Sequence, residues 1–127
     1  MTAVAEFLTQ AWIDELDEAG ARASVPDGLR LVVQQVVTDG DREMAYVIEI
    51  ADGRIHARTG RADTADVSFE LDRATATEIA RGDLSAQVAF MDGRLRLGGD
   101  LRAVLARAGD LAAIDDAFAA TRSRTEW

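Results

Sequence analysis

The first pattern of apolar and polar positions along the chain is helical. Over residues 4–18, apolar side chains recur every three to four residues, while acidic and amide side chains lie elsewhere. The residues on the apolar face are Phe7, Leu8, Ala11, Trp12 and Leu16. Breaks at Gly20, Pro26 and Gly28 then predict the end of this helix.

Beyond these breaks, the pattern changes to that of β-strands. Residues 29–37 are apolar and rich in valine, and residues 44–51 place Tyr46, Ile48 and Ile50 on one face. The intervening DGDR sequence predicts a hairpin loop.

Two more strands are expected before residue 72. Asp52-Gly53 is a tight-turn signal that leads into a strand at 54–59. Residues 66–71 alternate between apolar and polar side chains, with Phe69 on the apolar side. The four strands together predict an antiparallel meander with one apolar face and one polar face.

The second half of the chain turns helical again. Asp72 and Gly82 are suited to cap a helix at 73–81, and Ser85 and Gly93 bound a short helix at 86–91. A short strand then carries Leu95 and Leu97. Two last helices are expected after Asp100 and Asp110, with apolar stripes that include Leu101, Leu105, Leu111, Ile114 and Phe118.

This order of elements predicts an α+β fold. A five-stranded, mostly antiparallel sheet presents one apolar face, and the helices gather on that face to cover it. The length of 127 residues is appropriate for a single domain spanning residues 1–127.

Charge narrows the range of partners. The formal net charge is −9, and all fourteen basic residues are arginines scattered among acids. Nucleic acid is therefore not an expected partner, because phosphate binding needs a local basic patch. No basic leader and no bilayer-length apolar run is present, so we expect a cytoplasmic protein without stable membrane insertion. The arginine and alanine bias is typical of a GC-rich, bacterial genome.

The sequence contains no recognisable catalytic, metal-binding or phosphate-binding motif. There is no cysteine, and the single histidine, His56, alternates with Arg54 and Arg58 as on a solvated strand face. Residues 38–43 contain two aspartates but lack the remainder of a calcium loop. No serine lies in a nucleophile motif, and no glycine-rich loop carries a lysine. We expect no catalytic residue, no metal and no cofactor.

The stretch GDLSAQVAFMDGRLRLGGDL, residues 82–101, resembles the signature region of the sterol carrier protein type 2 domain family. The resemblance extends from about residue 29 to the end and is strongest over 65–105. The residues that carry it are Gly82, Gln87, Ala89, Phe90, Gly93, Leu95, Gly99 and Leu101.

The resemblance implies an apolar tunnel between sheet and helices. In the family, such tunnels hold sterols, fatty acids or fatty acyl-CoA, which are transferred without covalent change. The residues expected to bind lipid are Phe69, Ile79, Leu84, Gln87, Val88, Phe90, Met91, Leu95, Leu97, Leu101, Leu105, Ile114 and Phe118. Within this set, Phe90 and Met91 suit the tunnel wall and its gate. Gln87 either contacts the ligand head group or bonds the backbone at its helix end.

Three functions remain open from the sequence. The first is non-enzymatic binding, and transfer, of a fatty acid, fatty acyl-CoA or sterol-like lipid. The second is an interaction or dimerisation module with a filled core, in which Trp12 and the N-terminal helix form the contact surface; a homodimer stays open in either case. The third is an enzyme or an enzyme's accessory subunit, with Gln87, Tyr46 and His56 as its only candidate polar cluster.

Overall fold

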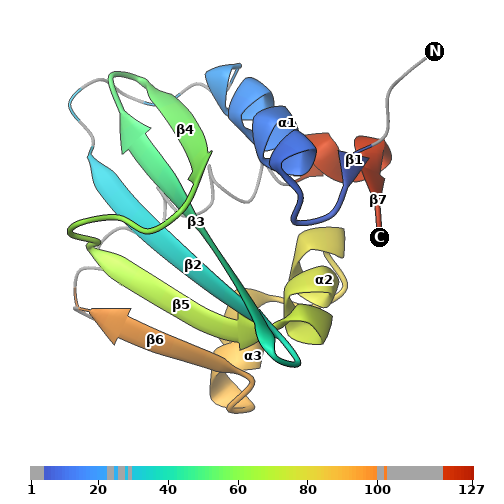
Figure 1. Ribbon diagram of the computed structural model, residues 1–127. Coiled ribbons are helices and arrows are strands. Elements are labelled where there is room, and N and C mark those ends of the chain that lie inside the picture. Colours follow the sequence, from blue (N-terminus) through green and yellow to red (C-terminus); the bar gives the residue numbers. More distant parts are fainter. Residues whose placement is uncertain (1–4, 23–24, 26–27, 29, 100–101, 103–118) are drawn as a thin grey trace.

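The computed structural model describes residues 5–22, 25, 28, 30–99, 102 and 119–127. Five strands form one sheet in the order β4-β3-β2-β5-β6. These strands are β2 (Leu31–Asp39), β3 (Arg42–Ala51), β4 (Arg54–Thr59), β5 (Val67–Asp72) and β6 (Leu95–Gly99). The helices are α1 (Gln10–Ala21), α2 (Arg73–Arg81) and α3 (Ala86–Met91) (Figure 1). The predicted α+β class and its five-stranded sheet are confirmed.

The sheet is mixed rather than a simple meander. The strands β2, β3 and β4 pair as consecutive antiparallel hairpins, but β5 returns to the other side of β2 and runs parallel to it. The meander prediction is therefore wrong for β5. The link from β4 to β5 is anchored on the polar side of β2, where the Ala62 amide donates to the Gln34 side chain at 3.0 Å and the Val32 amide donates to the Asp66 carboxylate at 2.8 Å.

The two predicted hairpin turns are confirmed. Gly40 and Asp41 separate β2 from β3, and Asp39 pairs with Arg42 across the turn. Between β3 and β4, Asp52 and Gly53 have φ values of 55° and 76°. Two successive positive φ values characterise the type I′ turn that joins twisted strands tightly.

The N-terminal helix begins later than its apolar pattern predicts. The Thr9 hydroxyl accepts the Trp12 amide at 3.3 Å and caps α1, so Phe7 and Leu8 precede the helix rather than lie on its face. Ala11 is exposed. Two further short strands, β1 (Ala5–Glu6) and β7 (Thr125–Glu126), pair in parallel. A strand of two residues is too short to be predicted from an alternation of apolar and polar side chains.

Gly20 does not end the helix but lies inside it. A Cβ atom at this position would stand 2.3 Å from the Ile55 carbonyl oxygen, closer than non-bonded atoms approach. The absence of a side chain therefore allows α1 to lie directly on β4. Asp17 fastens the contact, because its carboxylate accepts the Ala57 amide and its carbonyl accepts the Arg54 guanidinium, both at 2.9 Å.

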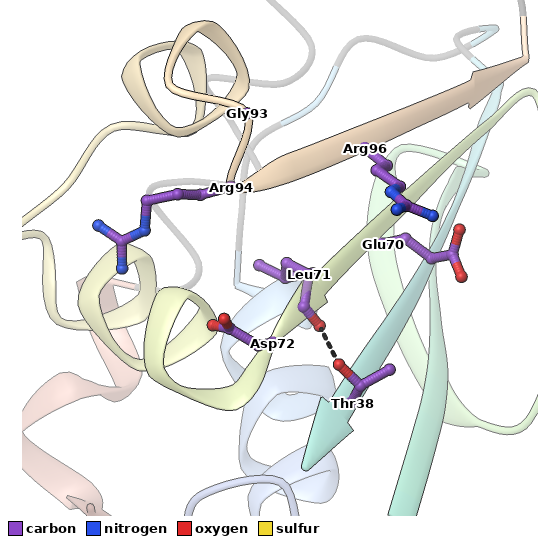
Figure 2. Close-up of a pocket in the computed structure, with 7 residues that line it drawn as sticks. All are labelled: Thr38, Glu70, Leu71, Asp72, Gly93, Arg94 and Arg96. Carbon is purple, nitrogen blue, oxygen red and sulfur yellow. Dashed lines mark hydrogen bonds between the residues drawn. The ribbon is translucent and has the colours of Figure 1, made fainter. Parts of the chain in front are cut away.

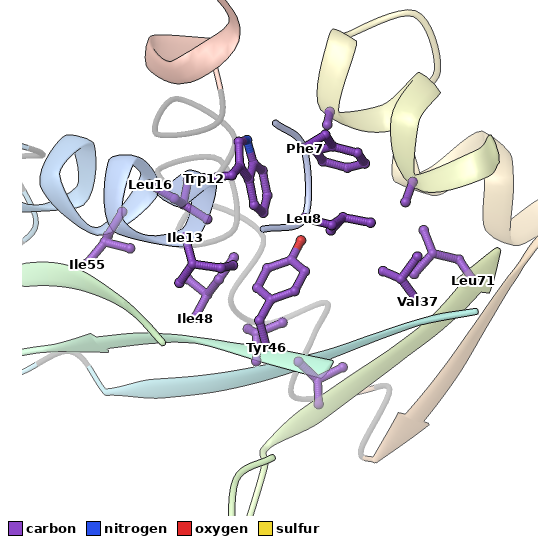
Figure 3. Close-up of a cluster of buried hydrophobic side chains, with 14 of the residues drawn as sticks. Phe7, Leu8, Trp12, Ile13, Leu16, Val37, Tyr46, Ile48, Ile55 and Leu71 are labelled. Atoms are coloured by element: carbon purple, nitrogen blue, oxygen red, sulfur yellow. The ribbon is translucent and has the colours of Figure 1, made fainter. Parts of the chain in front are cut away.

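A dense core lies between α1 and the sheet (Figure 3). Trp12 packs edge-on against Phe7 and Tyr46, with ring centroids 4.8 and 5.5 Å apart. Five further side chains of this core are at most 1% exposed: Ile13, Leu16, Ile48, Ile50 and Ile55. Trp12 is itself 1% exposed, so it cannot provide the contact surface of an interaction module.

The second half of the chain follows the predicted elements closely. The helices α2 and α3 have the expected bounds, and their N-terminal amides are accepted by Asp72 at 2.7 Å and Ser85 at 3.1 Å. Gly82 ends α2 in a left-handed conformation with φ of 84°. The predicted strand at Leu95 and Leu97 is β6. The helices expected after Asp100 and Asp110 lie outside the described residues.

Candidate functional site

The apolar face of the sheet is built from rows of side chains that run across the strands. Register places five residues in its central row: Thr59, Tyr46, Gln35, Phe69 and Leu97. One flanking row contains Ile48, Val33 and Val67, which are 0–1% exposed. The other contains Val37, Leu71 and Leu95, which are 1–6% exposed. The central row thus lies between two buried rows.

The part of the central row on β2, β5 and β6 is only partly buried. Tyr46 is buried at 3%, but Gln35, Phe69 and Leu97 are only partly buried. We name these three residues the open strip. Adjacent strands lie about 4.8 Å apart, so the strip extends roughly 10 Å from the middle of the sheet to its β6 edge. On β2, β5 and β6, the described side chains of the two flanking rows are buried, so the open strip is the only partly exposed part of the three rows on these strands.

Two further residues that were predicted to bind lipid pack against the same apolar cluster as the open strip. Ile79 on α2 and Leu84, between α2 and α3, are partly buried and pack against the core, as do Phe69 and Leu97. Leu95 is buried at 5%. Five of the sequence-predicted lipid residues therefore gather on β5, β6 and the α2 region.

The short helix α3 presents apolar side chains to solvent. Val88 and Phe90 are each 45% exposed and Met91 is 75% exposed, whereas Ala89 is fully buried. Gln87 is exposed as well. One small residue thus anchors the helix while its larger apolar side chains stand outside the described core.

The remaining predicted lipid residues are Leu101, Leu105, Ile114 and Phe118, and they lie outside the described residues.

Tyr46 closes the inner end of the central row. Its ring stacks edge-on with Trp12, and Figure 3 shows its hydroxyl directed from the sheet toward the layer of Leu8 and Trp12. Burial raises the pKa of Tyr46 well above its ordinary value, so the phenol stays neutral. From Tyr46 toward β6, the row therefore changes from a buried aromatic residue to partly exposed side chains.

The junction of α2, α3 and β6 is held by polar contacts. The Arg94 guanidinium donates to the Thr75 hydroxyl at 3.2 Å and pairs with Glu78 on α2. Hydrogen bonds from the Thr75 amide and hydroxyl lower the pKa of Asp72; burial opposes this effect, and the charge of Arg94 adds to it. Asp72 therefore remains an ionised helix cap.

A polar pocket of about 300 Å³ opens near the end of β5 (Figure 2). Its lining combines the Thr38 hydroxyl, two acidic side chains and two arginines. The lining residues are Thr38, Glu70, Leu71, Asp72, Gly93, Arg94 and Arg96. Thr38 donates to the Leu71 carbonyl at 3.5 Å, so Leu71 contributes backbone here while its side chain belongs to the core. Such a lining does not fit a hydrocarbon.

The other candidate groups occupy surface positions. His56 lies on the polar face of β4, opposite Glu49 on β3 and away from Ile55. It is therefore separated by the sheet from Tyr46, and Gln87 lies apart on α3. Among the described residues, no three side chains of metal-binding type are grouped, and no helix is long and apolar enough to cross a membrane.

Gln35 is the site residue that the sequence analysis missed. It has the same parity along β2 as Val33 and Val37, and that parity alone places its side chain on the apolar face. The signal in the sequence is a glutamine at a position where the alternation of the strand predicts an apolar residue.

Comparison with known proteins agrees with this geometry. The model of the family described as the SCP-2 sterol transfer family matches residues 13–111. No curated protein matches the chain significantly in sequence. A crystal structure of sterol carrier protein 2 matches with a TM-score of 0.67 and 22% identity, over 91% of this chain and 97% of that chain.

Two other solved structures extend the comparison. The solution structure of palmitated SCP2L2 from Aedes aegypti matches with a TM-score of 0.56 and 20% identity, over 84% of this chain and 86% of that chain. A double mutant of the sec-alkyl sulfatase PisA1 matches with a TM-score of 0.53 and 24% identity, over 65% of this chain and 13% of that chain. At these identities the likeness establishes the fold, which also occurs as a small part of a longer chain.

Proposed function

Because this chain belongs to the SCP-2 sterol transfer family, we propose that it binds a hydrophobic ligand against the open strip and releases it chemically unchanged. The family supports lipid binding or transfer as the coarse function. The proposal adds where the ligand lies: over Phe69 and Leu97, beside Ile79 and Leu84. It places the whole activity in a single domain of residues 1–127.

One observation carries the proposal. On β5 and β6, Phe69 and Leu97 stay partly exposed, while their neighbours Val67, Leu71 and Leu95 on the same strands are buried. A partly exposed apolar side chain contributes less to the free energy of folding than it would if it were fully buried. A hydrocarbon chain lying along the strip would recover the difference.

The energetics are sufficient without any catalyst. Burying one methylene group is worth about 0.8 kcal/mol, so a sixteen-carbon chain gains on the order of 10 kcal/mol before ordering costs. Several kilocalories are lost to ordering, which leaves micromolar binding or tighter. Fatty acids, fatty acyl-CoA and sterol-like lipids all offer sufficient apolar area. One structural relative is described as palmitated, which favours a fatty chain as the first ligand to try.

Helix α3 is the proposed route of access. It has six residues, and Ala89 is the only one of them buried. A short element with few buried contacts opens at low cost in free energy. Val88, Phe90 and Met91 would then exchange solvent for the ligand as it passes.

Native mass spectrometry of the freshly purified protein, followed by solvent extraction, tests the proposal. We expect a co-purifying lipid, or uptake of added palmitate, at about one molecule per chain. A clean apo mass with no uptake of palmitate, acyl-CoA or sterol would overturn it.

A pair of variants ties the binding to the strip. Leu97→Glu places a carboxylate in the strip, and ligand uptake should be lost. Gly98→Glu adds the same charge on the opposite face of the same strand, where a Cβ atom meets Ser68 only at ordinary distances of 3.7 and 3.8 Å. This variant should keep uptake. An equal loss of ligand uptake in both variants would show that the added charge alone, and not its position in the open strip, prevents binding.

A further inference from the structure

The most unusual residue on the apolar face is Gln35. It occupies the middle strand of the sheet, in the middle of the central row, and its register partners are Tyr46 on β3 and Phe69 on β5. Along its own strand it lies between Val33 and Val37, which are each 1% exposed. An amide is thus surrounded on four sides by apolar or aromatic residues.

The side chain of Gln35 makes no hydrogen bond to the residues that the structure describes, and it is partly exposed rather than sealed. Its neighbour Gln34, on the opposite face, shows the contrast. Gln34 accepts the Ala62 amide at 3.0 Å and donates to the Ser68 hydroxyl at 3.4 Å. The amide of Gln34 is bound into the fold, whereas that of Gln35, on the face that we assign to the ligand, has no partner among the described residues.

At this position, an amide without a partner among the described residues stabilises the fold less than an apolar side chain would. Placing a polar group among apolar neighbours without a partner costs free energy, and a leucine there would pack against Val33, Val37 and Phe69. The amide offers one acceptor and two donors, which a bound molecule can satisfy. The same arrangement also rejects a ligand that lacks a matching polar group.

The charge of that ligand group follows from the surroundings. In the central row and the two rows beside it, the described strand residues on this face include no charged side chain. A carboxylate or phosphate would be desolvated there without a counter-ion, which is costly. A hydroxyl, ketone or ester can exchange hydrogen bonds with an amide at no such cost.

We propose that Gln35 is a specificity-determining contact for an uncharged polar group of the ligand, such as a hydroxyl or carbonyl, held about 10 Å inside the β6 edge of the sheet. This inference rests on the proposed function and deepens it. It replaces Gln87, the polar contact weighed from the sequence, with an amide that lies in the strip itself. The ligand class is a neutral lipid with a hydrogen-bonding group, in preference to an ionised fatty acid.

Side-chain amide NMR offers a direct test. The chain has four glutamines and no asparagine, so the spectrum contains signals from only Gln10, Gln34, Gln35 and Gln87. The Gln35→Leu variant identifies the Gln35 signal by its loss. On addition of dodecan-1-ol, we expect the Gln35 signal to shift while those of Gln34 and Gln10, which have partners in the protein, stay in place.

Affinity measurements complete the test. The net contribution of one hydrogen bond corresponds to about a 2- to 12-fold change in affinity. Gln35→Leu should therefore weaken binding of dodecan-1-ol by that factor while leaving dodecane unchanged or tighter. The wild-type protein should also prefer dodecan-1-ol to dodecanoate at neutral pH. Gln10→Leu, the same change at an exposed glutamine of α1, should alter none of these affinities.

The other outcomes separate this inference from the proposed function. If backbone signals of the strip shift but the Gln35 amide does not, and Gln35→Leu keeps the alcohol preference, the inference is overturned and lipid binding stands. A Gln87 signal that shifts instead, or a preference for dodecanoate, overturns it as well. If no signal responds to any of the three ligands, the proposed function fails together with the inference.

Discussion

The apolar face of the sheet has two halves that share a sequence pattern and differ in burial. On β3 and β4, residues such as Ile48 and Ile55 are fully buried beneath α1. On β5 and β6, Phe69 and Leu97 alternate in the same way but remain partly exposed. Alternation therefore identifies the face of a strand, but it does not reveal whether the residues on that face are buried or stay partly exposed.

The cause of the difference is visible at single residues. In the sealed half, Gly20 allows α1 to touch β4 closely, and Trp12 fills the space toward Tyr46. In the open half, α3 sends only Ala89 into the core and leaves Phe90 and Met91 outside. Among the described residues, a large side chain of α1 is buried over the first half, whereas the side chain that α3 buries is an alanine.

Truncating one side chain in each half should give the largest effect. Ile48→Ala removes a fully buried side chain and is expected to lower the free energy of unfolding by about 2–5 kcal/mol. Phe69→Ala removes a larger side chain that is only partly buried, so we expect roughly 1–2 kcal/mol. Urea unfolding of both variants measures the contrast. A greater loss for Phe69→Ala would mean that the strip is core.

Adding a side chain at the close contact between α1 and β4 should have the next largest effect on stability. Gly20→Ala gains about 1 kcal/mol of helix propensity, but its Cβ collides with the Ile55 carbonyl. We expect a net loss of about 1–3 kcal/mol in thermal or urea unfolding. The exposed position Ala11 is the control, because Ala11→Gly should lose only about 1 kcal/mol from propensity. A stabilised Gly20→Ala protein would show that the α1 contact is loose.

Removing the cap of α2 should cost less. Asp72→Ala leaves the Thr75 amide without its acceptor and should lower stability by about 1 kcal/mol at neutral pH. The folded pKa of Asp72 is lowered, so this contribution is fully present above the unfolded pKa of about 3.9 and is lost as the pH falls through the folded pKa. Unfolding of wild type and variant at neutral and acidic pH should therefore converge in acid. A gap that persists in acid would contradict the assignment.

The smallest effect is expected on the outer surface of α3. Met91 is 75% exposed, so Met91→Ser should change the free energy of unfolding by less than about 0.5 kcal/mol. Thermal unfolding measures this directly. A loss of more than about 1 kcal/mol would mean that Met91 packs against the core and that the open half is less open than described.

Much of the fold was predictable from local signals. The bounds of α2 and α3 followed from Asp72, Gly82 and Ser85, because capping depends on side chains near the helix ends. The β3–β4 turn followed from Asp52-Gly53 for the same reason. Features that depend on distant partners were not predictable, namely the parallel return of β5 and the pairing of β1 with β7.

The candidate site shows the same limit. Phe69 and Leu97 were predicted as lipid residues, but composition cannot tell a tunnel wall from a filled core, since both are apolar. Gln35 was missed because an amide next to Gln34 in a valine-rich strand reads as solvated until register places it beside Tyr46 and Phe69. Its parity with Val33 and Val37 gives the face, but its neighbours on β3 and β5 depend on long-range pairing, which local sequence does not encode.

Methyl NMR during titration with dodecan-1-ol tests the central claim most directly, because it reports on both halves at once. We expect the methyl signals of Ile79, Leu84 and Leu97 to shift as the ligand binds, while those of Ile13, Leu16 and Ile48 stay in place. Shifts confined to the second group, or spread equally over both, would contradict the division of the sheet face into a sealed half and a binding half.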